Sequence, residues 1–229
     1  MHDKIEFAHP HPELPLDRRS FLRRGAAMLG GAALASSGIA RAGECALTQS
    51  DILGPMYNYG APMFQRKLAT DDEPGERLIL AGTVLAPDCR TPLPHTLIEI
   101  WQADTNGAYD KKQPGNFNEP PMPFRLRGML LTNERGQYEI ETIVPGAYPI
   151  PPGVPGLEKY GGLTRARHIH ISAMPFLSVP VTTQLYFMDD PNRPGDPWAG
   201  HKPSLALKTR SEGKFLKADF NFVLSPGTA

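Results

Sequence analysis

The sequence predicts an all-β fold, a β-sandwich with long loops and little helix. Proline and glycine are frequent, with 25 and 22 copies among 229 residues, and helix breakers at this density exclude long helices. Short runs of strand-forming residues recur between the breakers, and several of them alternate between apolar and polar side chains. Many short strands separated by turn signals are typical of a β-sandwich.

Six runs are expected to form the strands. In chain order they are residues 78–85, 96–102, 138–143, 168–173, 181–187 and 215–224. The segment Asn133-Glu134-Arg135-Gly136 predicts a turn between two strands. Residues 110–123 and 150–162 are rich in proline and polar or glycine residues and predict two long loops. Loops of this length inside a domain are often functional, so we expect these two to wall the active site.

The first 42 residues predict a signal peptide that is absent from the mature fold. Arg18 and Arg19 are followed by Phe and Leu, then by an uncharged run of small and apolar residues from 25 to 39, then by Ala40-Arg41-Ala42 as a cleavage site. This order resembles a twin-arginine export signal. The apolar run is shorter than the roughly 20 residues of a membrane span. We therefore expect export by the twin-arginine route, to the periplasm or outside the cell.

Removal of residues 1–42 leaves 187 residues, 43–229, enough for one domain with its own core. This part carries a formal charge of −2, because six of 24 basic and four of 24 acidic residues lie in the leader. Nothing in it indicates a nucleic-acid partner or a membrane span. Its two cysteines, Cys45 and Cys89, are expected to form a disulfide, since exported proteins sit where disulfides persist.

His168 and His170 lie two residues apart in a predicted strand. Residues two apart in a strand point to the same face, so the two imidazoles project together with Ser172. Ile169, Ile171 and Ala173 point to the opposite face, which we expect to be the core. Two imidazoles on one face can bind one metal ion, although a His-x-His pair alone is also compatible with two polar residues on a solvated face.

Several segments together resemble the intradiol ring-cleavage dioxygenases. The segment 97–109, with Gly82-x-Val84 before it, reads Leu-Ile-Glu-Ile-Trp-Gln-Ala-Asp-x-x-Gly-x-Tyr and is similar to the signature of that family. Residues 142–149 resemble the segment of its second tyrosine, and Arg165-x-x-His168-Ile169-His170 resembles its arginine and histidine pair. Residues 53–57 and 183–187 also match, in the same order along the chain.

The resemblance implies a mononuclear non-haem Fe(III) bound by four side chains, Tyr109, Tyr148, His168 and His170. It makes Tyr109 and His168 equatorial ligands, and Tyr148 and His170 axial ones. It implies a reaction in which O₂ cleaves a catechol-type ring between its two hydroxyl carbons to give a cis,cis-muconate-type diacid. Tyr148 would act as a general base, Arg165 would stabilise negative charge on the ring, and Gln184 would lie beside the substrate.

Two positions depart from the family pattern. Ala166-Arg167 stands where the family commonly has Pro-Ala, which alters the local charge but keeps the arginine and both histidines. Ile150 follows Tyr148-Pro149, where enzymes acting on protocatechuate tend to have tryptophan, and this favours relatives that cleave catechol or hydroxyquinol. The mature chain that we expect, residues 43–229, lacks room for the helical N-terminal domain of those relatives, so the ring substituents stay open.

Two other functions are compatible with the same residues. The first is an exported β-sandwich module that binds a metal or a catechol without turnover. The second is a zinc hydrolase built on the histidine pair, although no carboxylate or cysteine has an obvious ligand spacing to His168 and His170. The family tends to assemble, so a homo-oligomer or a sister subunit is expected as a possible partner.

Overall fold

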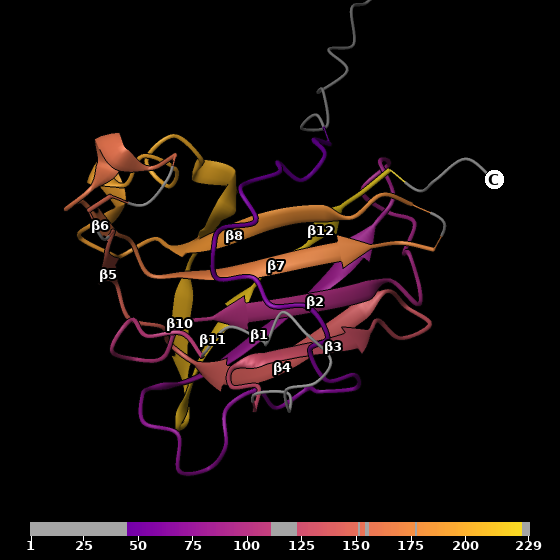
Figure 1. Cartoon of the computed structure of the whole chain (residues 1–229). Coiled ribbons are helices and arrows are strands. Elements are labelled where there is room, and N and C mark those ends of the chain that lie inside the picture. Colours follow the sequence, from indigo (N-terminus) through magenta and orange to yellow (C-terminus); the bar gives the residue numbers. More distant parts are fainter. Residues whose placement is uncertain (1–44, 111–122, 151, 154–155, 177, 226–229) are drawn as a thin grey trace, which may run out of the picture. The chain divides into compact units, whose positions relative to one another are not determined.

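Two five-stranded β-sheets make up most of the fold in the computed structural model (Figure 1). The structure describes residues 45–110, 123–150, 152–153, 156–176 and 178–225, so the predicted signal peptide lies outside the described residues. The helical segments of the described part are short 3-10 turns, η1 Glu158–Tyr160, η2 Arg193–Gly195 and η3 Pro203–Leu205. Among the described residues no helix has the length and apolar character to cross a bilayer. The predicted all-β class is confirmed.

The first sheet is built around β1. Strands β11, β12 and β4 all pair with β1, and β10 pairs with β11. The strands of this sheet are β1 Arg77–Leu85, β4 Gln137–Ile143, β10 Thr209–Glu212, β11 Phe215–Asp219 and β12 Phe222–Val223.

The second sheet has the order β3-β2-β7-β8-β9 and carries the predicted histidines. Its strands are β2 Leu97–Gln102, β3 Arg127–Leu131, β7 His168–Met174, β8 Val181–Phe187 and β9 Ala206–Leu207. A separate two-stranded sheet pairs β5 Tyr148–Pro149 with β6 Thr164–Arg165. The predicted strands at 78–85, 96–102, 138–143, 168–173 and 181–187 are therefore confirmed within one or two residues at their ends.

The core lies between the two large sheets. Leu78 and Leu80 of the first sheet and Ile98, Ile100 and Ile169 of the second are at most 1% exposed and belong to one apolar cluster. Apolar residues two apart fill this cluster because every second side chain of a strand points to the same face. Each such side chain stabilises the fold by about 1.5–3 kcal/mol relative to exposure.

The run 215–224 differs from the prediction, because it forms two short strands rather than one. Both strands pair in parallel with β1, and Phe220 and Asn221 between them interrupt the strand. There the carbonyl of Phe220 accepts a hydrogen bond from the Tyr138 hydroxyl at 2.7 Å, and Asn221 Oδ1 accepts one from the Thr83 amide at 2.9 Å. A Cβ at Gly82 would lie 1.7 Å from the Phe220 carbonyl oxygen, so the break depends on this glycine.

Strand β3 was not predicted from the sequence. Arg127 and Gly128 open the strand, and neither is a typical strand residue. The strand forms because it pairs along its length with β2, and because Gly128 leaves room for Gln65 and Leu68, whose side chains would lie 2.6 and 2.7 Å from a Cβ. The predicted turn at residues 133–136 is present and joins β3 to β4, with the Gly136 amide donating to the Asn133 carbonyl at 2.8 Å.

Two other predictions concern connections of the chain. The Cys45–Cys89 disulfide is confirmed, with 5.8 Å between the two Cα atoms. Of the two predicted loops, the first lies mainly in residues 111–122, outside the described residues. The second is described in part and contains the short turn η1.

Candidate functional site

The outer face of the second sheet carries the two histidines. His168 and His170 are 2% and 1% exposed, and Ile169 and Ile171 between and beyond them point into the core as predicted. The ring centroids of the two histidines lie 4.9 Å apart. Because both imidazoles are covered, they do not form the solvated polar face that was the other interpretation of the pair.

Neighbouring strands fix the position of each histidine. In the sheet register His170 lies opposite Trp101 of β2 and Gln184 of β8, and His168 lies opposite Tyr186. The Trp101 ring stacks on His170 with 4.9 Å between centroids and an interplanar angle of 10°. A Cβ at Gly54 would lie only 2.9 Å from Cε1 of His170, so the backbone at Gly54 packs directly against this ring.

The tautomer of His168 follows from its hydrogen bond. Its Nδ1 lies 2.6 Å from the carbonyl oxygen of Ala166, and a carbonyl can only accept. Nδ1 therefore carries the proton, and the lone pair is on Nε2. That nitrogen lies 3.4 Å from the Tyr148 hydroxyl oxygen. A neutral imidazole whose other nitrogen donates to a backbone carbonyl is the usual arrangement of a metal-binding histidine.

The two tyrosines come from connections between strands rather than from the sheet. Tyr109 follows the turn at 104–108, in which Asp104 Oδ1 accepts the amides of Asn106 and Ala108 at 2.8 and 2.9 Å. Tyr148 opens the two-residue strand β5 and pairs with Arg165 of β6. Gly107 brings the two connections together, since a Cβ there would lie 2.8 Å from the Cβ of Tyr148.

The four aromatic rings form a closed set of neighbours. Ring centroids are separated by 5.7 Å between Tyr109 and Tyr148 and by 5.6 Å between Tyr148 and His168. They are separated by 4.9 Å between His168 and His170 and by 6.3 Å between His170 and Tyr109. The structure therefore brings together the four predicted ligands, which span 62 positions of the sequence from 109 to 170.

Burial controls the protonation of these rings. It lowers the pKa of His168 to about 3, with the nearby Arg165 charge adding to the effect, and it lowers the pKa of His170 well below its ordinary value. It also raises the pKa of Tyr109 and of Tyr148. Both imidazoles are therefore neutral at pH 7 with lone pairs to donate, whereas the phenols stay protonated unless a strong positive charge binds beside them.

The second pair of predicted residues, Arg165 and Gln184, is fixed by buried hydrogen bonds. Arg165 Nη2 donates to Gln184 Oε1 at 2.6 Å, and Arg165 Nε donates to Asp196 Oδ2 at 2.9 Å. The guanidinium also lies over the Trp198 ring, 4.3 Å from its centroid. Gln184 in turn donates to the Ile52 carbonyl at 3.0 Å. The Arg165 charge is thus held rigidly beside Tyr148, its partner across β5 and β6.

Arg167, which departs from the family pattern, lies outside this set. Strand β7 begins after it, so its side chain does not share the direction of Ile169. Its Nε lies 3.1 Å from Asp190 Oδ2, and its guanidinium lies over the Phe187 ring. The extra charge is therefore paired by the Asp190 carboxylate.

The donor set fits a hard, highly charged metal ion. The Tyr109 hydroxyl and the Nδ1 atom of His170 are buried and have no hydrogen-bond partner in the part of the chain that the structure describes. The described residues contain no cluster of three or more His, Cys, Asp or Glu that could hold a metal, which gives the zinc interpretation no support. Two phenols and two imidazoles remain, and an ion that prefers anionic oxygen suits this mixture.

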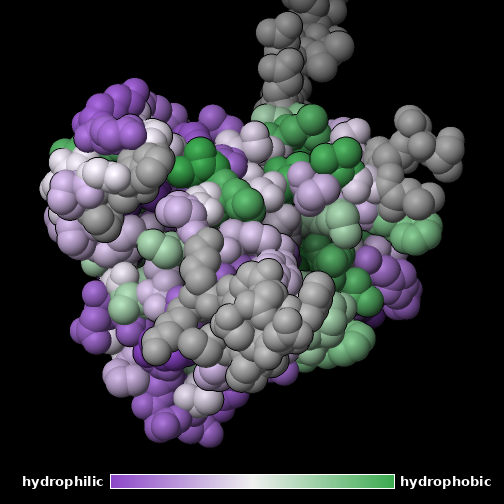
Figure 2. All heavy atoms as spheres, in the orientation of Figure 1, coloured by the Kyte–Doolittle hydropathy of each residue, from purple (hydrophilic) through white to green (hydrophobic). Residues whose placement is uncertain are grey.

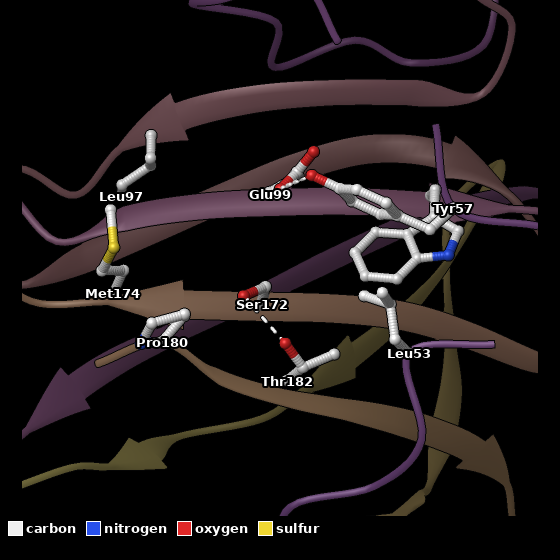
Figure 3. Close-up of a pocket in the computed structure, with 9 residues that line it drawn as sticks. Leu53, Tyr57, Leu97, Glu99, Ser172, Met174, Pro180 and Thr182 are labelled. Carbon is white, nitrogen blue, oxygen red and sulfur yellow. Dashed lines mark hydrogen bonds between the residues drawn. The ribbon is translucent and has the colours of Figure 1, made fainter. Parts of the chain in front are cut away.

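A groove of about 390 Å³ lies on the same face of the sheet, beyond Trp101. Figure 2 shows apolar side chains beside a hollow over this sheet, and Figure 3 shows the lining residues from β2, β7 and β8. The Tyr57 hydroxyl donates to Glu99 there at 3.2 Å, and burial raises the pKa of the Glu99 carboxyl (Figure 3). Trp101 lines the groove and stacks on His170, so it separates the groove from the four rings.

Sequence reasoning missed the residues that hold the site in place. Asp196 lies in a proline- and glycine-rich segment with no strand pattern, and nothing in the sequence connects it to Arg165. Arg127 and Asp110 form an ion pair beside Tyr109, with side chains 1% and 3% exposed. The alternation of Arg125 and Arg127 next to an apolar run was the one signal that could have indicated a strand with functional polar residues.

Comparison with known proteins gives consistent matches. The family described as Dioxygenase matches residues 52–226. A chlorocatechol 1,2-dioxygenase from Rhodococcus opacus is 34% identical over 192 residues, which cover 77% of this chain and 72% of that protein. A catechol 1,2-dioxygenase from Acinetobacter baylyi is 34% identical over 151 residues, which cover 63% of this chain and 47% of that protein.

The fold also matches solved structures. The dioxygenase domain of a dioxygenase and carbohydrate-binding protein fusion from Streptomyces sp. SirexAA-E superimposes with a TM-score of 0.64 and 33% sequence identity. The match covers 80% of this chain and 100% of that domain. The chain therefore spans a whole solved dioxygenase domain, but only about half the length of the Acinetobacter relative.

Proposed function

The chain belongs to the intradiol ring-cleavage dioxygenase family, and we propose that it is an Fe(III)-dependent enzyme acting on a catechol-type diol. It would cleave the ring between the two hydroxyl carbons and add both atoms of O₂, which gives a cis,cis-muconate-type diacid. The observation that carries this proposal is the closed set of Tyr109, Tyr148, His168 and His170, with neutral imidazoles and an unpaired phenol in one buried place.

These four side chains would hold the iron. A ferric ion bound there would favour the phenolate forms of both tyrosines and prepare the diol, rather than O₂, for reaction. The neutral state of His168 and His170 at pH 7 supports ligation without competition from protons. All four proposed ligands are on this chain, so we propose that one chain suffices to bind the metal without a sister subunit.

Tyr148 is the proposed base for the incoming diol. Its hydroxyl oxygen lies 3.4 Å from His168 Nε2, and the Arg165 charge favours its phenolate form. As a phenolate it would accept the proton of one diol hydroxyl at Oη. The other diol hydroxyl needs a second proton acceptor, and hydroxide from solvent would serve as one. General-base catalysis by a positioned group contributes about 10²–10⁴-fold to a rate.

Arg165 would stabilise negative charge that develops on the ring during oxygenation. Because Asp196 and Gln184 fix its guanidinium, the charge needs no reorganisation when the reaction occurs. Gln184 would act mainly through Arg165, since its carbonyl oxygen accepts from Nη2 and its amide nitrogen donates to Ile52. We propose it as a positioning group beside the substrate.

The proposed substrate is a catechol with apolar or no substituents. Ile150, which follows Tyr148-Pro149, is 4% exposed and offers no polar group to a charged substituent. The relatives named as chlorocatechol and catechol 1,2-dioxygenases support the same choice. A panel of catechol, chlorocatechols, hydroxyquinol and protocatechuate, with product identification, tests it. A kcat/KM for protocatechuate above that for catechol would contradict it.

We also propose export by the twin-arginine route, to the periplasm or outside the cell. The order of charge, apolar run and cleavage site in residues 1–42 supports this, and so does the Cys45–Cys89 disulfide, because disulfides persist mainly in oxidising compartments. Replacing Arg18 and Arg19 by lysine should retain the protein with its signal peptide in the cytoplasm. Unchanged processing and unchanged fractionation of that variant would contradict the proposal.

The direct test of function uses purified, iron-loaded protein. Phenolate-to-iron charge transfer should give a red-brown colour, and addition of catechol should shift the band and consume O₂ with formation of a diacid. Tyr109→Phe should remove much of the visible band, and an unchanged spectrum would remove Tyr109 from the ligand set. A coloured protein that binds catechol without O₂ uptake would instead be a binding module, and a colourless one would reject the iron site.

A further inference from the structure

Two arginines, Arg127 at the start of β3 and Arg125 just before it, contact the loop that carries Tyr109. Arg125 Nη1 and Nη2 each lie 3.1 Å from Asp104 Oδ2, before the tyrosine, and Arg127 Nε lies 2.6 Å from Asp110 Oδ1, directly after it. The two contacts differ in burial. The Arg125 side chain is 42% exposed, whereas the side chains of Arg127 and Asp110 are 1% and 3% exposed.

Arg127 also contacts a second segment of the site. Its Nη2 donates to the Met56 carbonyl at 2.6 Å. Met56 lies two residues after Gly54, whose backbone packs against the His170 ring. The guanidinium therefore contacts both the segment that packs against His170 and the residue that follows Tyr109. The rings of His170 and Tyr109 are themselves neighbours.

The Arg127 guanidinium lies close to the Tyr109 ring itself, with 5.9 Å from the guanidinium carbon to the ring centroid. Its Nη1 has no hydrogen-bond partner among the described residues, and the same holds for the Tyr109 hydroxyl. A buried ion pair contributes little net stability, because desolvation offsets the attraction.

We propose that Arg127, held by Asp110, is a positioning residue for the iron site. It fixes Tyr109 and the segment 54–56 relative to His170, and it keeps a permanent positive charge beside the Tyr109 phenolate. This inference rests on the proposed function for its spectroscopic consequence, but its structural consequence holds for the metal-free protein. The two consequences are measured separately.

The first measurement is hydrogen exchange of metal-free protein. Arg127→Met should raise exchange roughly tenfold or more in both segments 53–58 and 104–110, because one side chain joins them. Arg77→Met serves as the matched control. Arg77 forms an ion pair with Glu141 at 2.9 Å in the other sheet, and the Arg77 side chain is 19% exposed. This variant should leave both segments unchanged. Unchanged exchange in either segment of Arg127→Met would overturn the inference, whether or not the protein binds iron.

The second measurement is the charge-transfer band of iron-loaded variants. Arg127→Met and Asp110→Asn should shift the band and lower kcat by about 10–100-fold, the usual effect of residues behind metal ligands. Arg77→Met should leave the band and kcat unchanged. If Arg127→Met does not fold, Arg127→Lys decides, because lysine keeps the charge but lacks the planar fork through which Nε donates to Asp110 and Nη2 donates to Met56. A wild-type band and kcat in Arg127→Lys and Asp110→Asn would overturn the inference.

These outcomes separate the two proposals. A wild-type protein without a charge-transfer band contradicts the proposed function, while the exchange result still decides the positioning role. A coloured, active wild type whose Arg127 and Asp110 variants keep its band and its exchange rates contradicts only the positioning role.

Discussion

The two halves of the proposed ligand set are held in different ways. His168 and His170 belong to β7, which is paired on both sides along its length by β2 and β8. Tyr109 and Tyr148 belong to connections, one behind a turn closed by Asp104 and one in a strand of two residues. The sheet register positions the histidines, whereas specific contacts from distant residues position the tyrosines.

This difference teaches how such a site can be altered. A strand in the middle of a sheet tolerates small changes on its core face without moving its outer face, because many backbone hydrogen bonds hold it. A loop position depends on a few contacts, each of which is essential. We therefore expect the position of the histidines to withstand changes in neighbouring side chains, so that only loss of a histidine itself removes the metal. The position of the tyrosines should be lost when a residue that contacts their loops is changed.

The largest effect is expected from removing a strand ligand. His170→Gln should lower bound iron to a small fraction of one per chain and lower kcat/KM by more than about 100-fold, since even residues behind metal ligands contribute about 10–100-fold. Iron analysis and steady-state kinetics measure this. Cooperative urea unfolding should be retained. Full iron content in the variant would remove His170 from the ligand set.

The next effect tests the loop side through its glycine contact. Gly107 has φ +82°, and a Cβ there would lie 2.6 Å from the Ala147 carbonyl oxygen, so Gly107→Ala should cost about 3 kcal/mol from backbone strain and the clash together. Gly213 is the matched control, with φ +61° and no atom within 4 Å of a Cβ, and Gly213→Ala should cost about 1 kcal/mol.

Urea unfolding of the two alanine variants gives the comparison. Gly107→Ala should also alter the charge-transfer band, because the clash displaces Tyr148, whereas Gly213→Ala should not. Equal losses of stability in the two variants would show that the tyrosine connections do not depend on this close approach.

A smaller effect is expected on the pH dependence of stability, to which the histidines contribute and the tyrosines do not. The folded pKa of His168, about 3, is below the unfolded value of about 6.5, so below pH 6.5 the unfolded chain binds a proton that the native chain does not. The stability of metal-free protein should therefore fall as the pH falls from 6.5 toward 3, by about 1.4 kcal/mol per unit for this group. The tyrosines, with raised pKa values, contribute nothing in this range.

The variant His168→Gln measures this contribution. It should reduce the slope of unfolding free energy against pH between about 6 and 4 in metal-free protein, and Tyr109→Phe should leave the slope unchanged. An identical slope in wild type and His168→Gln would mean that this histidine is not buried in a neutral form.

The smallest effect concerns the core face of β7. Ile169 lies between the two histidines in sequence and is fully buried, so Ile169→Val should cost about 1 kcal/mol. Because the sheet holds the strand, the iron content and the charge-transfer band should not change. Thermal unfolding and absorption spectra of one preparation measure both. A shifted band would show that the outer face of β7 is not fixed by its register.

The same difference explains what the sequence could predict. The faces of His168, Ile169 and His170 follow from the two-residue period of a strand, and the strands with clean alternation were located correctly. The prediction that Tyr109 and Tyr148 lie beside these histidines required a resemblance to known proteins, because the path of a loop leaves no local pattern in the sequence. Arg127, Asp110 and Asp196 could not be predicted, since each acts through a partner that is close only after folding.

The most direct measurement is a crystal structure of iron-loaded protein with diffraction data collected at the iron absorption edge. The account predicts one anomalous peak per chain, in bonding contact with the hydroxyl oxygens of Tyr109 and Tyr148, with Nε2 of His168 and with a ring nitrogen of His170. A peak elsewhere on the chain, or one that contacts the histidines but neither tyrosine, would contradict it.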